Sequence, residues 1–225
     1  MLRSLPLLAL GLAFLGGCAD ARGRFDAFEE RRGSLDDVVD TAAGTGGAGG
    51  SEGAGGAGGC EPLAPNAVRG PAILTLDTST APGVPIMFWG EIETPALDGG
   101  TAVKFTYRAL DASDRRTEVG EVLVVGPIRI GDEGAFDAAA PRAELPGSAN
   151  AILPGVVIDS ELELHGTICG AQKFYCGTVS GKTYKPFEGP AAGHFGITLV
   201  DSKDDIPEQP RFGCAEDAFA RPLSE

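Results

Sequence analysis

The chain has 225 residues, a formal net charge of −14 at pH 7 and a sequence pI near 4.5. Phosphate backbones and anionic lipid surfaces repel such an acidic chain, so the composition argues against nucleic-acid binding and against electrostatic adhesion to a membrane. We therefore expect no nucleic-acid partner.

The first 17 residues have the three parts of an export signal. Arg3 supplies a positive charge, residues 5–15 form an apolar run, and Gly16 and Gly17 are small enough for a peptidase to approach the backbone. A helix needs about 20 apolar residues to span a bilayer, so this run is too short to stay as a transmembrane anchor. The pattern predicts a cleaved signal peptide over residues 1–17.

The residues Leu15-Gly16-Gly17-Cys18 resemble the lipobox of bacterial lipoproteins. The resemblance implies that a diacylglycerol is joined to the sulfur of Cys18 and that cleavage makes this residue the acylated N-terminus. More than one acyl chain is needed for stable anchoring, and two or three chains on one residue meet that need. Asp20 lies one position beyond the place where the family carries an inner-membrane retention signal, which implies an outer-membrane location in the cell envelope. The alternative is an ordinary secreted protein in which Cys18 has no such role.

Residues 18–59 are predicted to form a disordered tether. Residues 19–43 hold seven acidic residues and four arginines, which is too polar a composition to bury a core. Ten of the sixteen residues at 44–59 are glycine, and the conformational freedom of glycine opposes compact structure. A Gly-rich coil of this length spans about 35 Å, enough to clear lipid headgroups. Such tethers after a lipobox resemble those of surface lipoproteins from myxobacteria.

Residues 60–225 are predicted to form a single domain of antiparallel strands. Apolar and polar residues alternate most clearly over residues 156–168, and a period of two is typical of a half-buried strand. Shorter runs of the same kind cover residues 72–77, 86–93, 102–108, 118–125, part of 134–145, 173–182 and 194–201. Turns rich in glycine and proline separate them. We expect an all-β fold, either an antiparallel β-sandwich or a jelly-roll-like barrel.

The chain has five cysteines, and the odd number leaves Cys18 over if the other four form disulfides. Those four allow three pairings. We favour Cys169–Cys176, which would close a short turn, together with Cys60–Cys214, which would join the beginning of the domain to its end. No C-x2-C pair occurs, so no metal site is predicted.

Few residues have the sequence context of a catalytic site. His165 and His194 are expected to be surface residues of strands rather than general bases. Glu161 and Glu163 share one strand face about 7 Å apart, a separation that glycosidases use, but alternating charges also wet the outer face of any sheet. Ser180 comes one residue too late for a G-x-S-x-G motif. We predict no catalytic residue and no cofactor.

Three aromatic residues, Trp89, Tyr107 and Tyr175, are the predicted ligand-binding residues, because rings on strands can stack on sugars; the alternative is that they fill the core. The leading hypothesis is a monomeric envelope lipoprotein, held at the membrane by lipid, whose non-enzymatic domain binds a glycan or another envelope protein. A structural or assembly role in the envelope and a polysaccharide hydrolase remain as alternatives, since β-sandwiches host many functions.

Overall fold

The computed structural model describes residues 60–61 and 63–223. The predicted signal peptide (1–17), the predicted lipidation site Cys18 and the rest of the predicted tether (to residue 59) lie outside these residues. No helix in the described part of the chain is long and apolar enough to cross a membrane.

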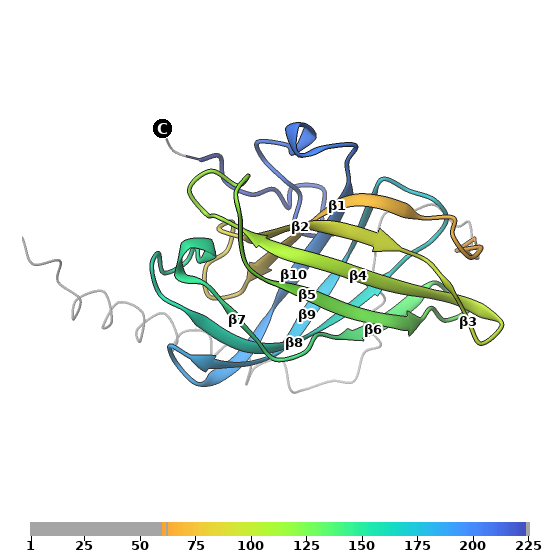
Figure 1. Ribbon diagram of the computed structural model, residues 1–225, viewed down its shortest axis with the longest axis horizontal. Helices are drawn as coiled ribbons and strands as arrows, with labels where there is room; N and C mark the ends of the chain where they lie inside the picture. Colours follow the sequence, from red (N-terminus) through yellow and green to blue (C-terminus); the bar gives the residue numbers. More distant parts are fainter. Residues whose placement is uncertain (1–59, 62, 224–225) are drawn as a thin grey trace, which may run out of the picture. The chain divides into compact units, whose positions relative to one another are not determined.

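Ten strands and two short 3-10 turns make up the domain (Figure 1). In chain order they are β1 (Arg69–Thr78), β2 (Ile86–Glu93), β3 (Ala96–Leu97), β4 (Gly100–Leu110), β5 (Glu118–Arg129), β6 (Ala135–Ala139), β7 (Ala143–Leu145), η1 (Gly147–Ala149), β8 (Ile158–Thr167), β9 (Phe174–Lys185), β10 (Gly189–Leu199) and η2 (Lys203–Asp205). Every strand pair is antiparallel. The prediction of an all-β antiparallel fold is confirmed.

Many strands pair with a strand close by in the chain, and the first strand, β1, also pairs with the last, β10. The order is β3-β4-β2-β1-β10-β9-β8-β6, while β5 pairs with β4 and β7 pairs with β8. The sheet curls until β5 faces β6 and β7 across a seam that has no hydrogen-bonded ladder between the described strands (Figure 1). The predicted sandwich or jelly-roll-like barrel is thus realised as one curled sheet, in which turns join β1 to β2, β4 to β5, β8 to β9 and β9 to β10, and β1 pairs with β10.

Side chains alternate between the inside and the outside of the curled sheet. On β8, Leu162 and Leu164 pack into the main core, whereas Glu161, Glu163 and His165 lie on the outer face. This is the alternation that residues 156–168 predicted, and it follows from the two-residue period of a strand. The inside of the sheet is therefore apolar, and the outside carries the charge.

One end of the interior is filled by three phenylalanine rings. The ring centroids of Phe105 and Phe136 are 5.7 Å apart, and those of Phe136 and Phe195 are 6.3 Å apart. Gly166 and Gly177 make room for them, because a Cβ atom on either glycine would come within 2.6 Å of the Phe195 ring. We call this the aromatic end; it lies where β8 ends and β9 begins.

Both disulfides lie at the aromatic end, and the favoured pairing was wrong. Cys60 is bonded to Cys169 with a Cα–Cα distance of 5.1 Å, and Cys176 is bonded to Cys214 with a Cα–Cα distance of 5.3 Å. The register explains the difference. Cys176 is the partner of Thr167 on β8 and shares the outer face of β9 with Thr178, where the C-terminal segment passes, whereas Cys169 lies beyond the end of β8. The two cysteines of this hairpin therefore point to different partners.

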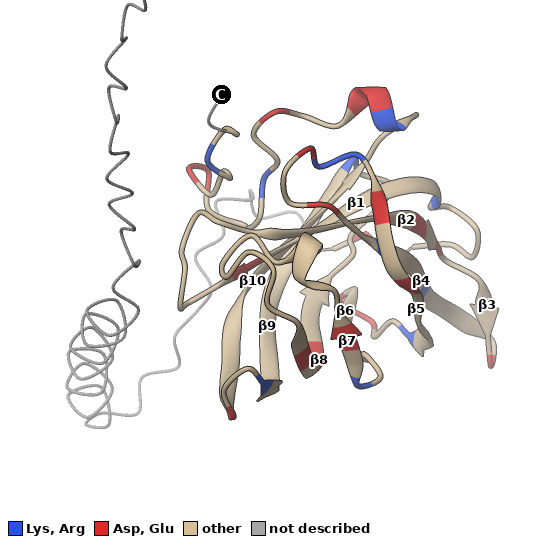
Figure 2. Cartoon of the chain, turned by 60° about the vertical axis from the view of Figure 1, so that its left-hand side comes forward, with Lys and Arg blue, Asp and Glu red and all other residues tan. Residues whose placement is uncertain are grey.

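A second, smaller core lies outside the sheet, beneath the C-terminal segment. Ile206 packs there on Ile73, Met87 and Leu110, which come from the outer faces of β1, β2 and β4. Arg116 holds the segment in place by donating to the backbone carbonyls of Lys203 and Ile206. The turn η2 carries acidic and basic residues and forms the outer edge of this segment (Figure 2).

Candidate functional site

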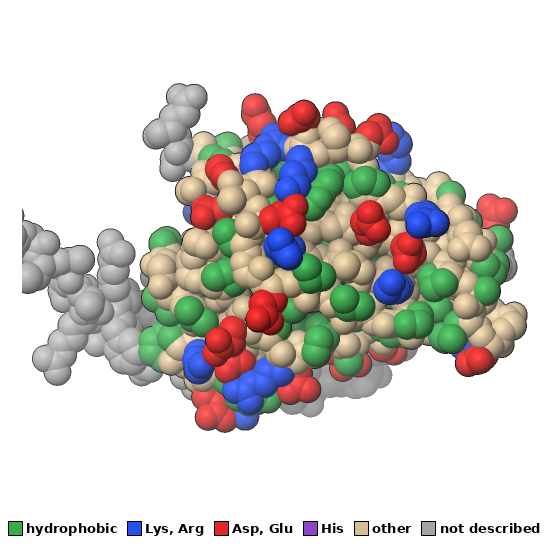
Figure 3. All heavy atoms as spheres, viewed as in Figure 1, with side chains coloured by type: hydrophobic (Ala, Val, Ile, Leu, Met, Phe, Trp, Pro, Cys, Tyr) green, Lys and Arg blue, Asp and Glu red, His purple; other side chains and the backbone are tan. Residues whose placement is uncertain are grey.

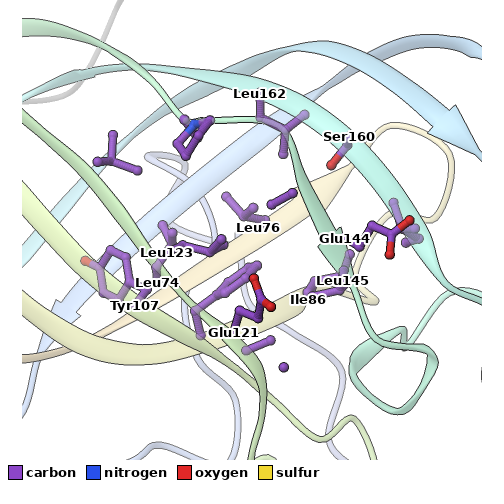
Figure 4. A pocket seen from close by; sticks show the side chains of 18 of the residues that line it. Leu74, Leu76, Ile86, Tyr107, Glu121, Leu123, Glu144, Leu145, Ser160 and Leu162 are labelled. Carbon is purple, nitrogen blue, oxygen red and sulfur yellow. The ribbon is translucent and has the colours of Figure 1, made fainter.

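An apolar cavity of about 100 Å³ lies inside the curled sheet, at the end opposite the disulfides. Its walls come from the inner faces of β1, β2, β4, β5, β7 and β8 (Figure 4). The aliphatic side chains that line it include Leu74, Leu76, Ile86, Leu123, Leu145 and Leu162. Closed antiparallel sheets of about eight strands can enclose one small ligand. We call this the cavity end.

Tyr107 brings a polar group to the wall of the cavity. Its side chain is buried, and its hydroxyl has no hydrogen-bond partner within the described part of the protein. Burial raises the pKa of this phenol well above its usual range, so the hydroxyl stays protonated. Figure 4 shows the ring at one side of the cavity, with its oxygen directed away from Glu121.

Glu121 brings a carboxylate to the cavity, and a β-bulge positions it there. Val122 is the partner of Arg108 and Val119 is the partner of Ala109, so Gly120 and Glu121 have no partners on β4. Gly120 adopts φ +74°, a left-handed conformation that glycine accepts without strain. Bulges next to binding sites often serve to re-aim a side chain. Here the bulge places an exposed acidic residue beside a largely apolar wall, which also carries Glu144 and Ser160 (Figure 4).

The neighbouring charges at the cavity end are paired with one another. Arg142 donates two hydrogen bonds to Asp159, at 2.9 and 2.7 Å, and the Lys185 ammonium lies 2.5 Å from a Glu144 carboxylate oxygen. The hydrogen bonds from Arg142 lower the pKa of Asp159. On the face seen in Figure 3, acidic and basic side chains are interleaved. Within each of the two ion pairs, the basic residue neutralises the acidic one.

A separate polar cluster lies on the outer face of the sheet. His165 contacts Asp137 through Nδ1 at 2.7 Å and Ser180 through Nε2 at 2.9 Å. This is the order of contacts in a Ser-His-Asp triad. The sequence did not reveal it, because the three residues belong to β8, β6 and β9, and only the pairing of these strands brings them together.

The surroundings of this cluster do not suit acyl transfer. The aspartate of a catalytic triad is buried, whereas the Asp137 side chain is 72% exposed. Glu163 is the direct partner of Ser180 on the neighbouring strand, and its carboxylate lies 3.9 Å from His165 Nε2. A carboxylate there would repel the oxyanion that forms during attack on an ester or amide. The cluster is better explained as a hydrogen-bonded surface network.

The structure does not bring the three predicted ligand-binding aromatics together. Trp89 lies on the outer face of β2, against the second core and 5.7 Å from the Lys203 ammonium. Tyr175 is buried at the aromatic end, where its hydroxyl donates to the carbonyl of Gly170. Only Tyr107 lines the cavity. Ligand binding by these residues stays a prediction, and they form no common platform for a sugar.

The other sequence candidates also lie on the outer face. Glu161 accepts a hydrogen bond from the Tyr184 hydroxyl at 3.1 Å, and His194 is an exposed residue of β10 beside its strand partner Asp77. Burial raises the pKa of Asp77 despite a hydrogen bond from the Gly83 amide. No group of three or more His, Cys, Asp or Glu side chains in the described ranges could hold a metal ion.

The chain matches no protein-family model, no curated protein and no solved structure. Its function must therefore be argued from the geometry of the cavity end and of the outer face.

Proposed function

We propose that this protein is a lipid-anchored lipoprotein of the cell envelope, and that its β-domain is a non-enzymatic module that binds a small apolar molecule in the cavity. The cavity is the observation that carries the proposal. An unfilled apolar space of this size costs a folded protein about 2 kcal/mol, which a ligand of matching shape would recover. The lipobox resemblance of residues 15–18 supports the anchor.

The volume limits the ligand. A cavity needs roughly 10–15 Å³ for each water-sized group, so about 100 Å³ accepts a molecule of about seven to ten non-hydrogen atoms. A glycan chain is too large for the interior, and on the surface it would need the stacking platform that Trp89, Tyr107 and Tyr175 do not form. Among the ligand classes considered, the geometry favours a small apolar one.

The binding test compares two faces of one strand. On β5, Leu123 faces the cavity, whereas Val124 is 48% exposed on the outer face. Benzene or hexan-1-ol titrated into the protein should shift NMR signals of cavity residues. Leu123→Phe should abolish the shifts by filling the space, and the matched control Val124→Phe should retain them.

Loss of the NMR shifts in both variants would mean that the probe does not bind in the cavity. No binding of any apolar probe to the unaltered protein would favour the structural or assembly role.

The anchor is tested separately. Cys18→Ser removes the only sulfur that the lipobox resemblance assigns to lipid, so the variant should move from the membrane fraction to the soluble fraction and lose labelling by radioactive palmitate. A variant that still fractionates with membranes would overturn the lipoprotein part of the proposal and leave the cavity part intact.

A serine hydrolase, which differs from the polysaccharide hydrolase suggested by Glu161 and Glu163, would rest on one observation, the contacts among Asp137, His165 and Ser180. A fluorophosphonate reagent labels an activated serine covalently, and we expect it to leave Ser180 unlabelled. Stoichiometric labelling that disappears in Ser180→Ala, and not in the control Ser148→Ala, would support a serine hydrolase with Ser180 as its nucleophile.

A further inference from the structure

Glu121 is an exposed charged residue that lines the cavity. Leu123 and Val125, two and four residues further along β5, both pack into the main core, while Val122 and Val124 face outward and are exposed. The bulge at Gly120 and Glu121 interrupts this alternation, and the Glu121 side chain lines the cavity while it stays exposed to solvent. Its carboxylate is therefore accessible to a charged group of a ligand at the cavity.

No basic side chain compensates this carboxylate in the described part of the chain. The other acidic residue of the cavity wall, Glu144, has the Lys185 ammonium at 2.5 Å, and the nearby Asp159 has Arg142. Glu121 takes part in none of the ion pairs. One unneutralised negative charge therefore borders the cavity.

The sign of this charge selects among apolar ligands. A fatty acid would bring a second carboxylate to Glu121, and like charges at close range repel. A protonated amine would supply the missing counter-charge, and a hydrogen bond between two charged groups is about twice as strong as a neutral one. The apolar walls would take the hydrocarbon part of the same molecule.

We infer that the cavity binds a small aliphatic primary amine, with its ammonium group on Glu121 and its hydrocarbon chain among the leucines of β1, β5 and β8. This inference rests on the proposed binding function. The cavity volume limits the chain to about six carbons, since hexylamine has about seven non-hydrogen atoms.

The test compares three probes of one length, hexylamine, hexan-1-ol and hexanoate, titrated at pH 7 into the full chain. We expect affinity to fall in that order. Glu121→Gln should weaken hexylamine binding about fivefold, the size typical of a partly solvated ion pair, should leave hexan-1-ol unchanged and should improve hexanoate binding. Glu133→Gln, which removes the same charge from an exposed turn at the aromatic end, is the matched control and should change nothing.

The outcomes separate the two proposals. Binding of hexan-1-ol with hexanoate equal to or better than hexylamine, or with no effect of Glu121→Gln, overturns the amine inference alone. If none of the three probes binds, the proposed binding function fails with it. Decylamine supplies a length check, because a chain that exceeds the cavity should bind no better than hexylamine.

Discussion

The two ends of the curled sheet are built from the same strands but differ in how they are filled. At the aromatic end, Phe105, Phe136 and Phe195 occupy the interior and glycines on β8 and β9 leave room for the rings. At the cavity end, leucines line a space that the protein does not fill. Rings matched to glycines pack densely, whereas aliphatic side chains around a bulged strand leave a void.

The two ends also differ in their covalent cross-links. Both disulfides lie at the aromatic end. Near the cavity end, the turn between β9 and β10 exposes Phe187 to 61%, and the link from η1 to β8 exposes Val157 to 40%. We therefore expect local stability to be higher at the aromatic end than at the cavity end.

The largest expected effect on the free energy of unfolding concerns the two disulfides at the aromatic end. Replacing Cys60 and Cys169 together by serine removes a link between residues 109 apart in sequence, which in the chain-entropy model stabilises by up to about 5 kcal/mol. Denaturant unfolding should show this loss, and the Cys176/Cys214 double variant, with a separation of 38, should lose up to about 4 kcal/mol. A loss below about 1 kcal/mol for both would mean that the disulfides do not stabilise this end.

The second effect compares truncations at the two ends. Phe195→Ala at the aromatic end should cost about 3–5 kcal/mol, because the ring is fully buried against the Phe136 ring and two glycines. Leu123→Ala should cost less, about 2 kcal/mol, because that side chain is only partly buried and already borders a void. Thermal unfolding of both variants measures the difference. Equal losses of stability in the two variants would contradict the inference that the aromatic end is packed more densely than the cavity end.

The smallest effect concerns charge at the cavity end. The two hydrogen bonds from Arg142 hold the pKa of Asp159 below its ordinary value of 3.8, so the folded state binds the proton less tightly than the unfolded state. The stabilisation is therefore present above pH 3.8 and is lost as the pH falls through the lower, folded-state pKa.

Arg142→Ala should remove the stabilisation that the Arg142–Asp159 pair supplies. The difference in free energy of unfolding between this variant and the unaltered protein should therefore be small at pH 7 and should vanish in strong acid. Lys173→Ala is a control, since Lys173 takes part in none of the ion pairs of the described residues. A difference that grows as the pH falls would contradict the assigned cause.

Much of the fold could be predicted from local patterns. The alternation over residues 156–168 predicted β8, and the shorter runs predicted parts of the other long strands, because the two-residue period of a strand is visible in any half-buried segment. The cavity could not be predicted, since an inward-facing Leu123 looks the same in sequence whether it meets another side chain or a void. The position of Glu121 was equally hidden, because the bulge that places it depends on the pairing of β4 with β5.

The sequence by itself determined the all-β class, the alternation of the strands and the expectation of a lipid anchor at Cys18, because each of these depends on residues close together in the chain. Only the tertiary structure decided the disulfide partners, the contacts of His165 with Asp137 and Ser180, and the closing of the sheet around a cavity. All of these depend on strand order and register, which bring together residues far apart in the chain through contacts that no local pattern records.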